Sequence, residues 1–134
     1  YIKRGIYNTY MDTIIEAVIK VVLSGILAMI VHEGGHSFMA RLYKRKLHFK
    51  LKFGKLFKVI PIPRGIWQMP FDISRKAQRN IAMAGFGTEF LLVIIFAIIP
   101  YTRITILPYY GLIALLHLLL YKFYAGNESD FRWF

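Results

Sequence analysis

The sequence contains no cysteine. This absence excludes disulfide bonds, zinc sites built on thiolates, and a cysteine nucleophile. Acidic residues are also scarce: Asp and Glu number 7 against 18 Lys and Arg, and the formal net charge is +11. Any metal site or acid–base catalyst in this chain must therefore be built from four histidines and seven carboxylates.

Charged residues of either sign are few for a water-soluble chain. They make up 19% of the sequence, whereas hydrophobic residues make up 57%. Soluble domains have about 25% charged and about 45–50% apolar residues. The 134 residues suffice for a single domain. The excess of apolar surface in so short a chain indicates a lipid rather than an aqueous environment.

Three apolar stretches have the length of a membrane span, and they cover about 13–42, 81–99 and 104–124. A span needs about 20 residues, because a helix rises about 1.5 Å per residue. The alternative, buried helices of a soluble protein, leaves little polar chain to cover them. The first stretch is also too long for the apolar core of a cleaved signal peptide. We therefore predict an α-helical integral membrane protein with three transmembrane helices, all in one domain, 1–134.

Lysine and arginine predict the orientation of these spans. Most of them lie in the loop 43–79, and the turn between the second and third spans contains only Arg103. The positive-inside rule places the loop and the C-terminus in the cytoplasm and the N-terminus outside. A basic segment beside a span is most simply explained by anionic lipid headgroups. A nucleic-acid partner is the weaker reading of the same charges, and we expect none.

The basic loop contains a pattern of strands. Residues 47–53 alternate apolar and polar side chains, which is the period of a half-buried strand. A second apolar run, 56–60, precedes Pro61 and Pro63. We predict a β-hairpin or sheet edge at the membrane surface that ends in a proline-rich turn.

The end of the first span contains the sequence His-Glu-Gly-Gly-His at 32–36. Positions four apart share one face of a helix, so His32 and His36 can reach the same metal ion. Glu33 is placed to act as general base, taking a proton from water and later returning it to the leaving amine. Two histidines and a glutamate hydrogen-bonded inside the bundle are the structural alternative. Ionisable residues inside a span nevertheless mark function by default.

A catalytic zinc needs a third protein ligand. If the third span ends near Tyr124, Glu128 and Asp130 emerge at the depth of the two motif histidines. His117 falls in the middle of that span, and we interpret it as a buried polar contact rather than a ligand.

These features resemble the site-2 protease family of intramembrane zinc metalloproteases, over about 13–134. That family has a three-helix core with a membrane-associated β-hairpin after the first helix. Its second helix opens with a basic stretch and an Ala-Gly-Pro-x-x-Asn motif, which Ala84-Gly85 resembles. Its third helix supplies an aspartate, and Ser129-Asp130-Phe131 takes that place. The resemblance implies that Asp130 is the third zinc ligand.

Two positions depart from the family pattern. Phe86 replaces its proline, and Glu89 replaces an asparagine that helps to hold the substrate. Glu89 is either functional or a charge neutralised within the bundle by Lys122 or His117. For the substrate site we nominate Glu89 and Gly85, together with Phe53 on the hairpin.

The leading hypothesis is a zinc-dependent endopeptidase that cleaves transmembrane proteins. The substrate, partly unwound, would add as a strand to the hairpin edge. The alternatives are an inactive pseudoprotease that serves as a membrane binding or assembly subunit, and a metal transporter that uses His117 and Glu89. The transporter would need an oligomer, and homo- or hetero-oligomers also fit the other two hypotheses.

Overall fold

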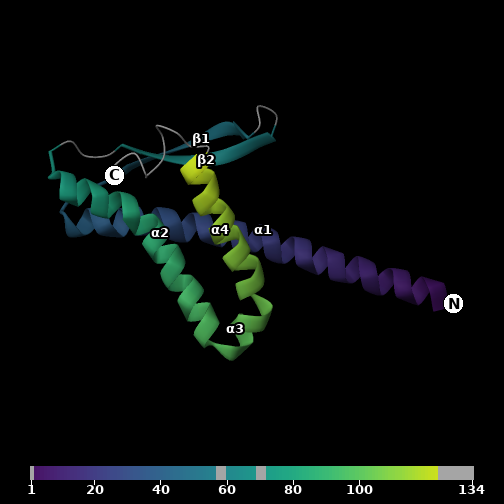
Figure 1. The fold of residues 1–134 in the computed structure, drawn as a ribbon. Coiled ribbons are helices and arrows are strands. Elements are labelled where there is room, and N and C mark those ends of the chain that lie inside the picture. The colour runs from purple at the N-terminus through teal and green to yellow at the C-terminus, as the bar shows by residue number, and fades with distance from the viewer. Residues whose placement is uncertain (1, 57–59, 69–71, 124–134) are drawn as a thin grey trace.

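The structure is a computed structural model that describes residues 2–56, 60–68 and 72–123. Its elements are the helices α1 (Ile2–Leu42), α2 (Arg75–Ile98), α3 (Pro100–Thr105) and α4 (Leu107–Phe123), and the strands β1 (His48–Leu56) and β2 (Ile60–Gln68). Figure 1 shows α2 and α4 joined through the short α3 and crossing α1, which extends well beyond them toward its N-terminus. The mainly helical class predicted from the sequence is confirmed.

Two of the described helices are long and apolar enough to cross a membrane. They are Met11–Leu42 within α1 and Arg75–Ile98, which is α2. Only 11% and 28% of their most apolar windows are buried inside the protein. The core helix of a soluble protein would be mostly buried, so these helices expose an apolar surface that lipid would cover.

The predicted boundaries need three corrections. The basic segment 75–79, which we assigned to the loop, forms the first turns of α2, because Ser74 caps that helix by accepting a hydrogen bond from the Ala77 N–H at 3.2 Å. The third apolar stretch is not one helix from 104: α3 ends at Thr105 and α4 begins at Leu107. Proline at 108 fits the first turn of a helix but not its interior, which favours a new start there. The resulting α4 has 17 residues.

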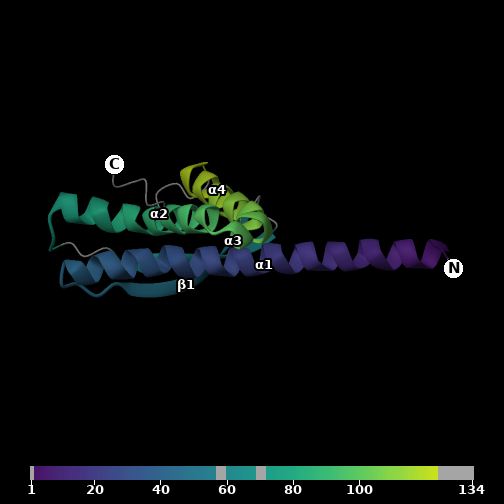
Figure 2. The same ribbon diagram turned by 90° about the horizontal axis from the view of Figure 1, so that it is seen from below.

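The third correction concerns the prolines of the loop. β1 and β2 pair antiparallel, and Pro61 and Pro63 lie within β2, opposite Lys55 and Phe53, instead of in a turn after the strands. Both strands of a two-stranded sheet are edges, where proline is tolerated because the outward N–H needs no partner. Figures 1 and 2 show the pair alongside the C-terminal part of α1, and Figure 2 shows α2 and α4 on the other side of that helix.

The end of α1 is fixed by a Schellman motif. The N–H of Arg45 donates to the carbonyl of Ala40 at 2.9 Å, and the N–H of Lys44 donates to that of Arg41 at 2.9 Å. Lys44 takes a left-handed conformation with φ of 55°, as the C′ position of this motif requires. The chain therefore turns sharply after the helix that carries the histidine motif and enters β1.

Helices α1 and α2 pack closely and run antiparallel. Small residues are buried on both helices: Ala28, Gly35 and Ala40 on α1, and Ala77, Ala82 and Gly85 on α2. Such residues let helix backbones approach in a membrane. The Thr88 hydroxyl lies 3.0 Å from the carbonyl of Val31 on α1, and also near the carbonyls of Ala84 and Gly85 on its own helix. This register places the middle of α2 opposite the histidine motif.

Candidate metal centre

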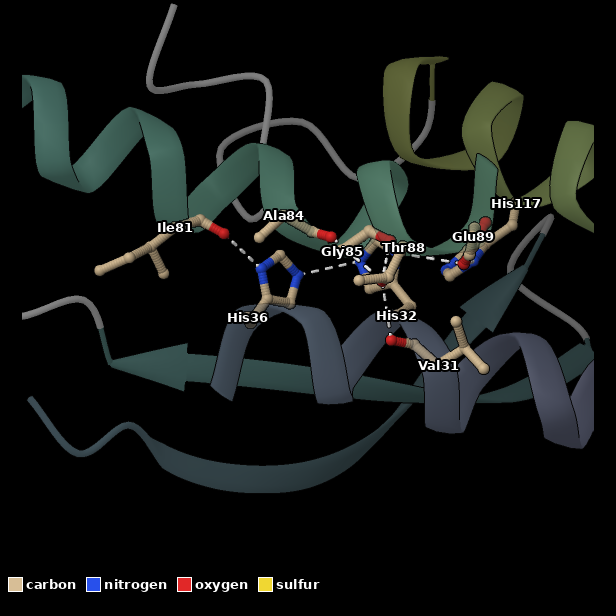
Figure 3. Close-up of polar contacts among 9 residues, drawn as sticks. All are labelled: Val31, His32, His36, Ile81, Ala84, Gly85, Thr88, Glu89 and His117. Atoms are coloured by element: carbon tan, nitrogen blue, oxygen red, sulfur yellow. Dashed lines mark hydrogen bonds and ion pairs between the residues drawn. The ribbon is translucent and has the colours of Figure 1, made fainter. Parts of the chain in front are cut away.

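His32 and His36 lie one turn apart on the face of α1 that packs against α2, and both are buried, at 0% and 3% exposure. Their Nε2 atoms face each other at 3.0 Å (Figure 3). The spacing of four residues thus does what the sequence predicts: it brings two imidazole nitrogens to one point. Two ligands of a tetrahedral zinc with Zn–N bonds of about 2.0–2.1 Å lie about 3.3 Å apart, close to the observed separation.

The far side of the His36 ring contacts a backbone oxygen. Its Nδ1 lies 2.7 Å from the carbonyl oxygen of Ile81 on α2. A carbonyl oxygen can only accept a hydrogen bond, so Nδ1 is the atom that carries the proton. In the neutral ring the Nε2 of His36 is then a lone pair directed at His32.

The far side of the His32 ring faces a carboxylate. Its Nδ1 lies 3.1 Å from Oε1 of Glu89, another α2 residue, and both side chains are buried. A lone pair against a buried carboxylate would be repulsive, so this Nδ1 also carries a proton. Metal-bound histidines characteristically donate their second N–H to a carboxylate or a backbone carbonyl. His36 does so to Ile81, and His32 has a carboxylate within ion-pair distance of its Nδ1.

The two Nε2 atoms consequently present lone pairs to each other at 3.0 Å. Two such lone pairs repel unless a positive charge lies between them. That charge is either an additional proton or a metal ion. The donor set therefore fits a metal on the Nε2 side of both rings.

Gly85 provides the space on that side. A Cβ atom added at Gly85 would lie 2.7 Å from Nε2 of His32 and 2.7 Å from Nε2 of His36. Carbon atoms do not approach ring nitrogens so closely, so any side chain at this position would displace the rings. The absence of a side chain at 85 lets α2 approach both ligand atoms without displacing them.

A second group of ligand atoms adjoins the first. Potential metal-ligating atoms of His32, Glu89 and His117 lie within 4.8 Å of one another, so this group could also hold a metal ion. His117, on α4, places its Nδ1 2.6 Å from Oε1 of Glu89. His32 belongs to both groups, because its Nε2 faces His36 and its Nδ1 faces Glu89.

Aromatic rings surround His32. Its ring centroid lies 4.6 Å from those of Phe86 and His117 and 5.4 Å from that of Tyr121. Phe86 and Tyr121 also contact each other edge to face, with centroids 5.6 Å apart. These rings keep bulk water from the His32–Glu89 contact and so strengthen its electrostatic attraction.

The structure gathers some of the predicted site residues and not others. His32, His36, Gly85 and Glu89 meet at the contact of α1 and α2 (Figure 3). Glu33 is partly buried beside His32 on α1. Phe53 lies in β1, paired with Pro63, in a separate element. Asp130 lies outside the described residues, so its assignment as third ligand stays a prediction.

His117 and Thr88 have positions at the site that the sequence did not specify. We expected a buried polar contact for His117, and the structure shows that its partner is Glu89. His117 is therefore a partner of that carboxylate within the bundle. An ionisable pair within apolar helices was the available signal, but the partner of each depended on the helix register.

Comparison of the chain with models of protein families, with curated proteins and with solved structures gave no match.

Proposed function

We propose that this protein is an intramembrane zinc metalloprotease, with zinc held by Nε2 of His32 and His36 and by Asp130. One observation carries the proposal: Nδ1 of His36 donates to the Ile81 carbonyl at 2.7 Å, Nδ1 of His32 lies 3.1 Å from the Glu89 carboxylate, and the two Nε2 atoms lie 3.0 Å apart. Two imidazoles with one carboxylate are a ligand set typical of catalytic zinc. When bound, zinc supplies Lewis acidity to the peptide carbonyl and to water.

The chain's own residues would perform the remaining steps. Glu33, next to the first ligand, accepts a proton from the attacking water and returns it to the leaving amine. Gly85, without a side chain, lets α2 lie directly against the ligand atoms. Phe86 and Tyr121, packed on His32, limit the entry of bulk water.

The proposed setting is a membrane crossed by α1, α2 and α4, with the N-terminus outside and the segment from Tyr43 to Ser74 in the cytoplasm. Arg75 and Lys76 at the start of α2 lie beside this segment and suit anionic headgroups. A transmembrane substrate, unwound near the cytoplasmic side, would pair with the exposed edge of β1 or β2. The hairpin has such edges because its only strand pairing in the described residues is between β1 and β2.

One observation favours the binding or assembly subunit as the second candidate. Glu89, at the position where the resemblance implies a substrate-holding asparagine, is buried and faces His32 and His117. Its carboxylate is thus engaged within the bundle. A protein with this arrangement could keep the metal for stability and bind transmembrane partners without cleaving them.

The decisive experiment combines metal content with cleavage of single-span peptides in liposomes. The wild type is compared with Glu33→Gln and with Glu16→Gln, a matched control on the same helix whose carboxylate pairs with Lys20 at 2.6 Å. We expect bound zinc in all three and a loss of about 10²–10⁴-fold in cleavage for Glu33→Gln alone, the usual contribution of a general base.

The other outcomes discriminate between the candidates. Zinc in the wild type with no cleavage of any peptide would support the binding subunit. Cleavage that survives Glu33→Gln would contradict the proposed base. A wild type that binds no zinc would show that a proton, and not a metal, lies between the two Nε2 atoms.

A further inference from the structure

The carboxylate of Glu89 joins three helices through a single oxygen atom. Its Oε1 lies 2.6 Å from Nδ1 of His117 on α4 and 3.1 Å from Nδ1 of His32 on α1, while Glu89 itself belongs to α2. Figure 3 shows Glu89 between the two histidines on the side of the site away from His36. Glu89 therefore contacts a proposed metal ligand, His32, through the ring nitrogen that does not face His36. His117 in turn contacts Glu89.

A buried carboxylate in an apolar helix bundle is costly unless it is paired. Glu89 is 2% exposed. The two imidazole nitrogens compensate for this burial because each can donate an N–H to the same oxygen, which has more than one lone pair. The contact with His117 is the shorter, so His117 holds in place the same oxygen that faces His32.

The proton on Nδ1 of His32 decides what its other nitrogen can do. A neutral imidazole has one N–H and one lone pair. With the proton on Nδ1, where the Glu89 carboxylate at 3.1 Å favours it, the lone pair must be at Nε2, which faces Nε2 of His36 and lies against Gly85. Without Glu89, either nitrogen could carry the proton, and the ring would lose the contact that sets its rotation.

We propose that Glu89 is the positioning residue of the metal site, and that His117 supports it. Glu89 fixes the Nδ1–H tautomer and the ring orientation of His32, so that the Nε2 lone pair is directed to the metal. This assignment rests on the proposed metal site. It gives Glu89 a role within the bundle in place of contact with the substrate, and it gives His117 a role that is neither ligand nor transport site.

The effect on metal affinity should follow the chemistry at position 89. Loss of a residue that orients a metal ligand usually lowers the affinity 10–100-fold, about 1.4–2.8 kcal/mol. Glu89→Leu removes both acceptor oxygens and should show this loss. Glu89→Gln keeps one acceptor oxygen and should recover part of it. His117→Leu leaves the His32–Glu89 contact and should have the smallest effect of the three.

The measurements are zinc affinity by chelator competition and the nitrogen-15 NMR shifts of the histidine rings in metal-free protein. Two variants calibrate the affinity: His36→Ala for loss of a ligand, and Phe90→Leu, next to Glu89 but 67% exposed, for a neutral change. In metal-free protein an additional proton lies between the two Nε2 atoms, and we expect the wild type and Phe90→Leu to keep Nδ1 of His32 protonated as well. Glu89→Leu should release the Nδ1 proton of His32 to either ring nitrogen while His36, which donates to Ile81, keeps its own Nδ1 proton; a general loss of stability would release both rings.

Two results would overturn the proposal. If Glu89→Leu binds zinc as tightly as the wild type with His32 unchanged in tautomer, Glu89 does not position the ring. If Glu89→Leu and His117→Leu both abolish binding as completely as His36→Ala, the two residues are ligands of a metal held with His32. The NMR measurement needs no metal or activity, so it tests Glu89 even if the protein cleaves nothing.

Discussion

At the residue scale, a substitution at Gly85 tests whether His32 and His36 bind a metal or only pack against α2. The Cβ of an alanine at 85 would lie 2.7 Å from both Nε2 atoms. Gly87 is the matched control, since it lies on the same helix, is exposed, and would place its Cβ with nothing within 4 Å. We expect Gly85→Ala to lower zinc affinity by more than about tenfold, as a misdirected ligand does, and Gly87→Ala to leave it unchanged.

The measurement is again chelator competition on purified protein in detergent, with circular dichroism to show that both variants keep their helices. If Gly85→Ala binds zinc like Gly87→Ala, the metal does not lie between the two rings and α2. The same variants should rank in the same order in peptide cleavage.

The residue scale also shows where sequence reasoning is strong and where it ends. The convergence of His32 and His36 follows from helical periodicity alone, because both residues lie on one helix and one face. The partners Ile81 and Glu89 are 45 residues from His36 and 57 residues from His32, respectively. Their contacts depend on how α1 and α2 are aligned along their lengths, and no local pattern in the sequence specifies that register.

At the scale of elements, the approach of α1 and α2 depends on Gly35. An alanine Cβ there would lie 2.4 Å from both the carbonyl oxygen of Ala84 and the hydroxyl of Thr88. The carbonyl belongs to the backbone of α2 and cannot move unless the helix shifts. Gly34 is exposed and would place its Cβ with nothing within 4 Å, so it is the control next in sequence.

We expect Gly35→Ala to destabilise the protein by about 1–3 kcal/mol, the usual cost of overpacking. Gly34→Ala should be neutral or slightly stabilising, since alanine is the better helix former. Thermal unfolding in detergent tests both variants. Equal midpoints for the two would show that α1 and α2 do not pack at Gly35 as closely as the structure indicates.

The first turns of α2 contain basic residues, which the N-terminus of a helix disfavours. Arg75, Lys76 and Arg79 lie in its first turns, and no acidic residue lies in the first turn. Cations are unfavourable at a helix N-terminus because the macrodipole is positive there. Headgroups of anionic lipid would offset this cost, which supports a membrane boundary at this end of α2.

At the scale of the whole molecule, one stripe of residues along α1 changes from buried to polar and so indicates where the helix bundle ends. Every fourth residue from Ser24 to Ala40 is buried: Ser24, Ala28, His32, His36 and Ala40. The same stripe continues toward the N-terminus as Lys20, Glu16 and Asp12, of which Lys20 is partly buried and the other two are exposed. Lys20 pairs with Glu16 at 2.6 Å and lies 5.5 Å from the ring centre of Tyr109. The stripe becomes polar where α1 passes the start of α4, as expected where a helix leaves an apolar environment.

The absence of cysteine makes this topology directly measurable. A single cysteine introduced into the chain is the only site that a membrane-impermeant maleimide can modify. We choose Tyr101→Cys in α3, where the side chain is 74% exposed, and Lys46→Cys after α1, which is also exposed. If α1 and α2 cross the bilayer with the basic segment inside, intact cells should label Tyr101→Cys strongly. Lys46→Cys should react only after the membrane is permeabilised, and the cysteine-free parent should not react in either state.

Labelling of Lys46→Cys in intact cells, with Tyr101→Cys protected, would reverse the orientation and place the histidine motif near the outer surface. Labelling of both in intact cells would mean that α2 does not span the membrane, and the proposed cleavage of transmembrane substrates would then lose its physical basis.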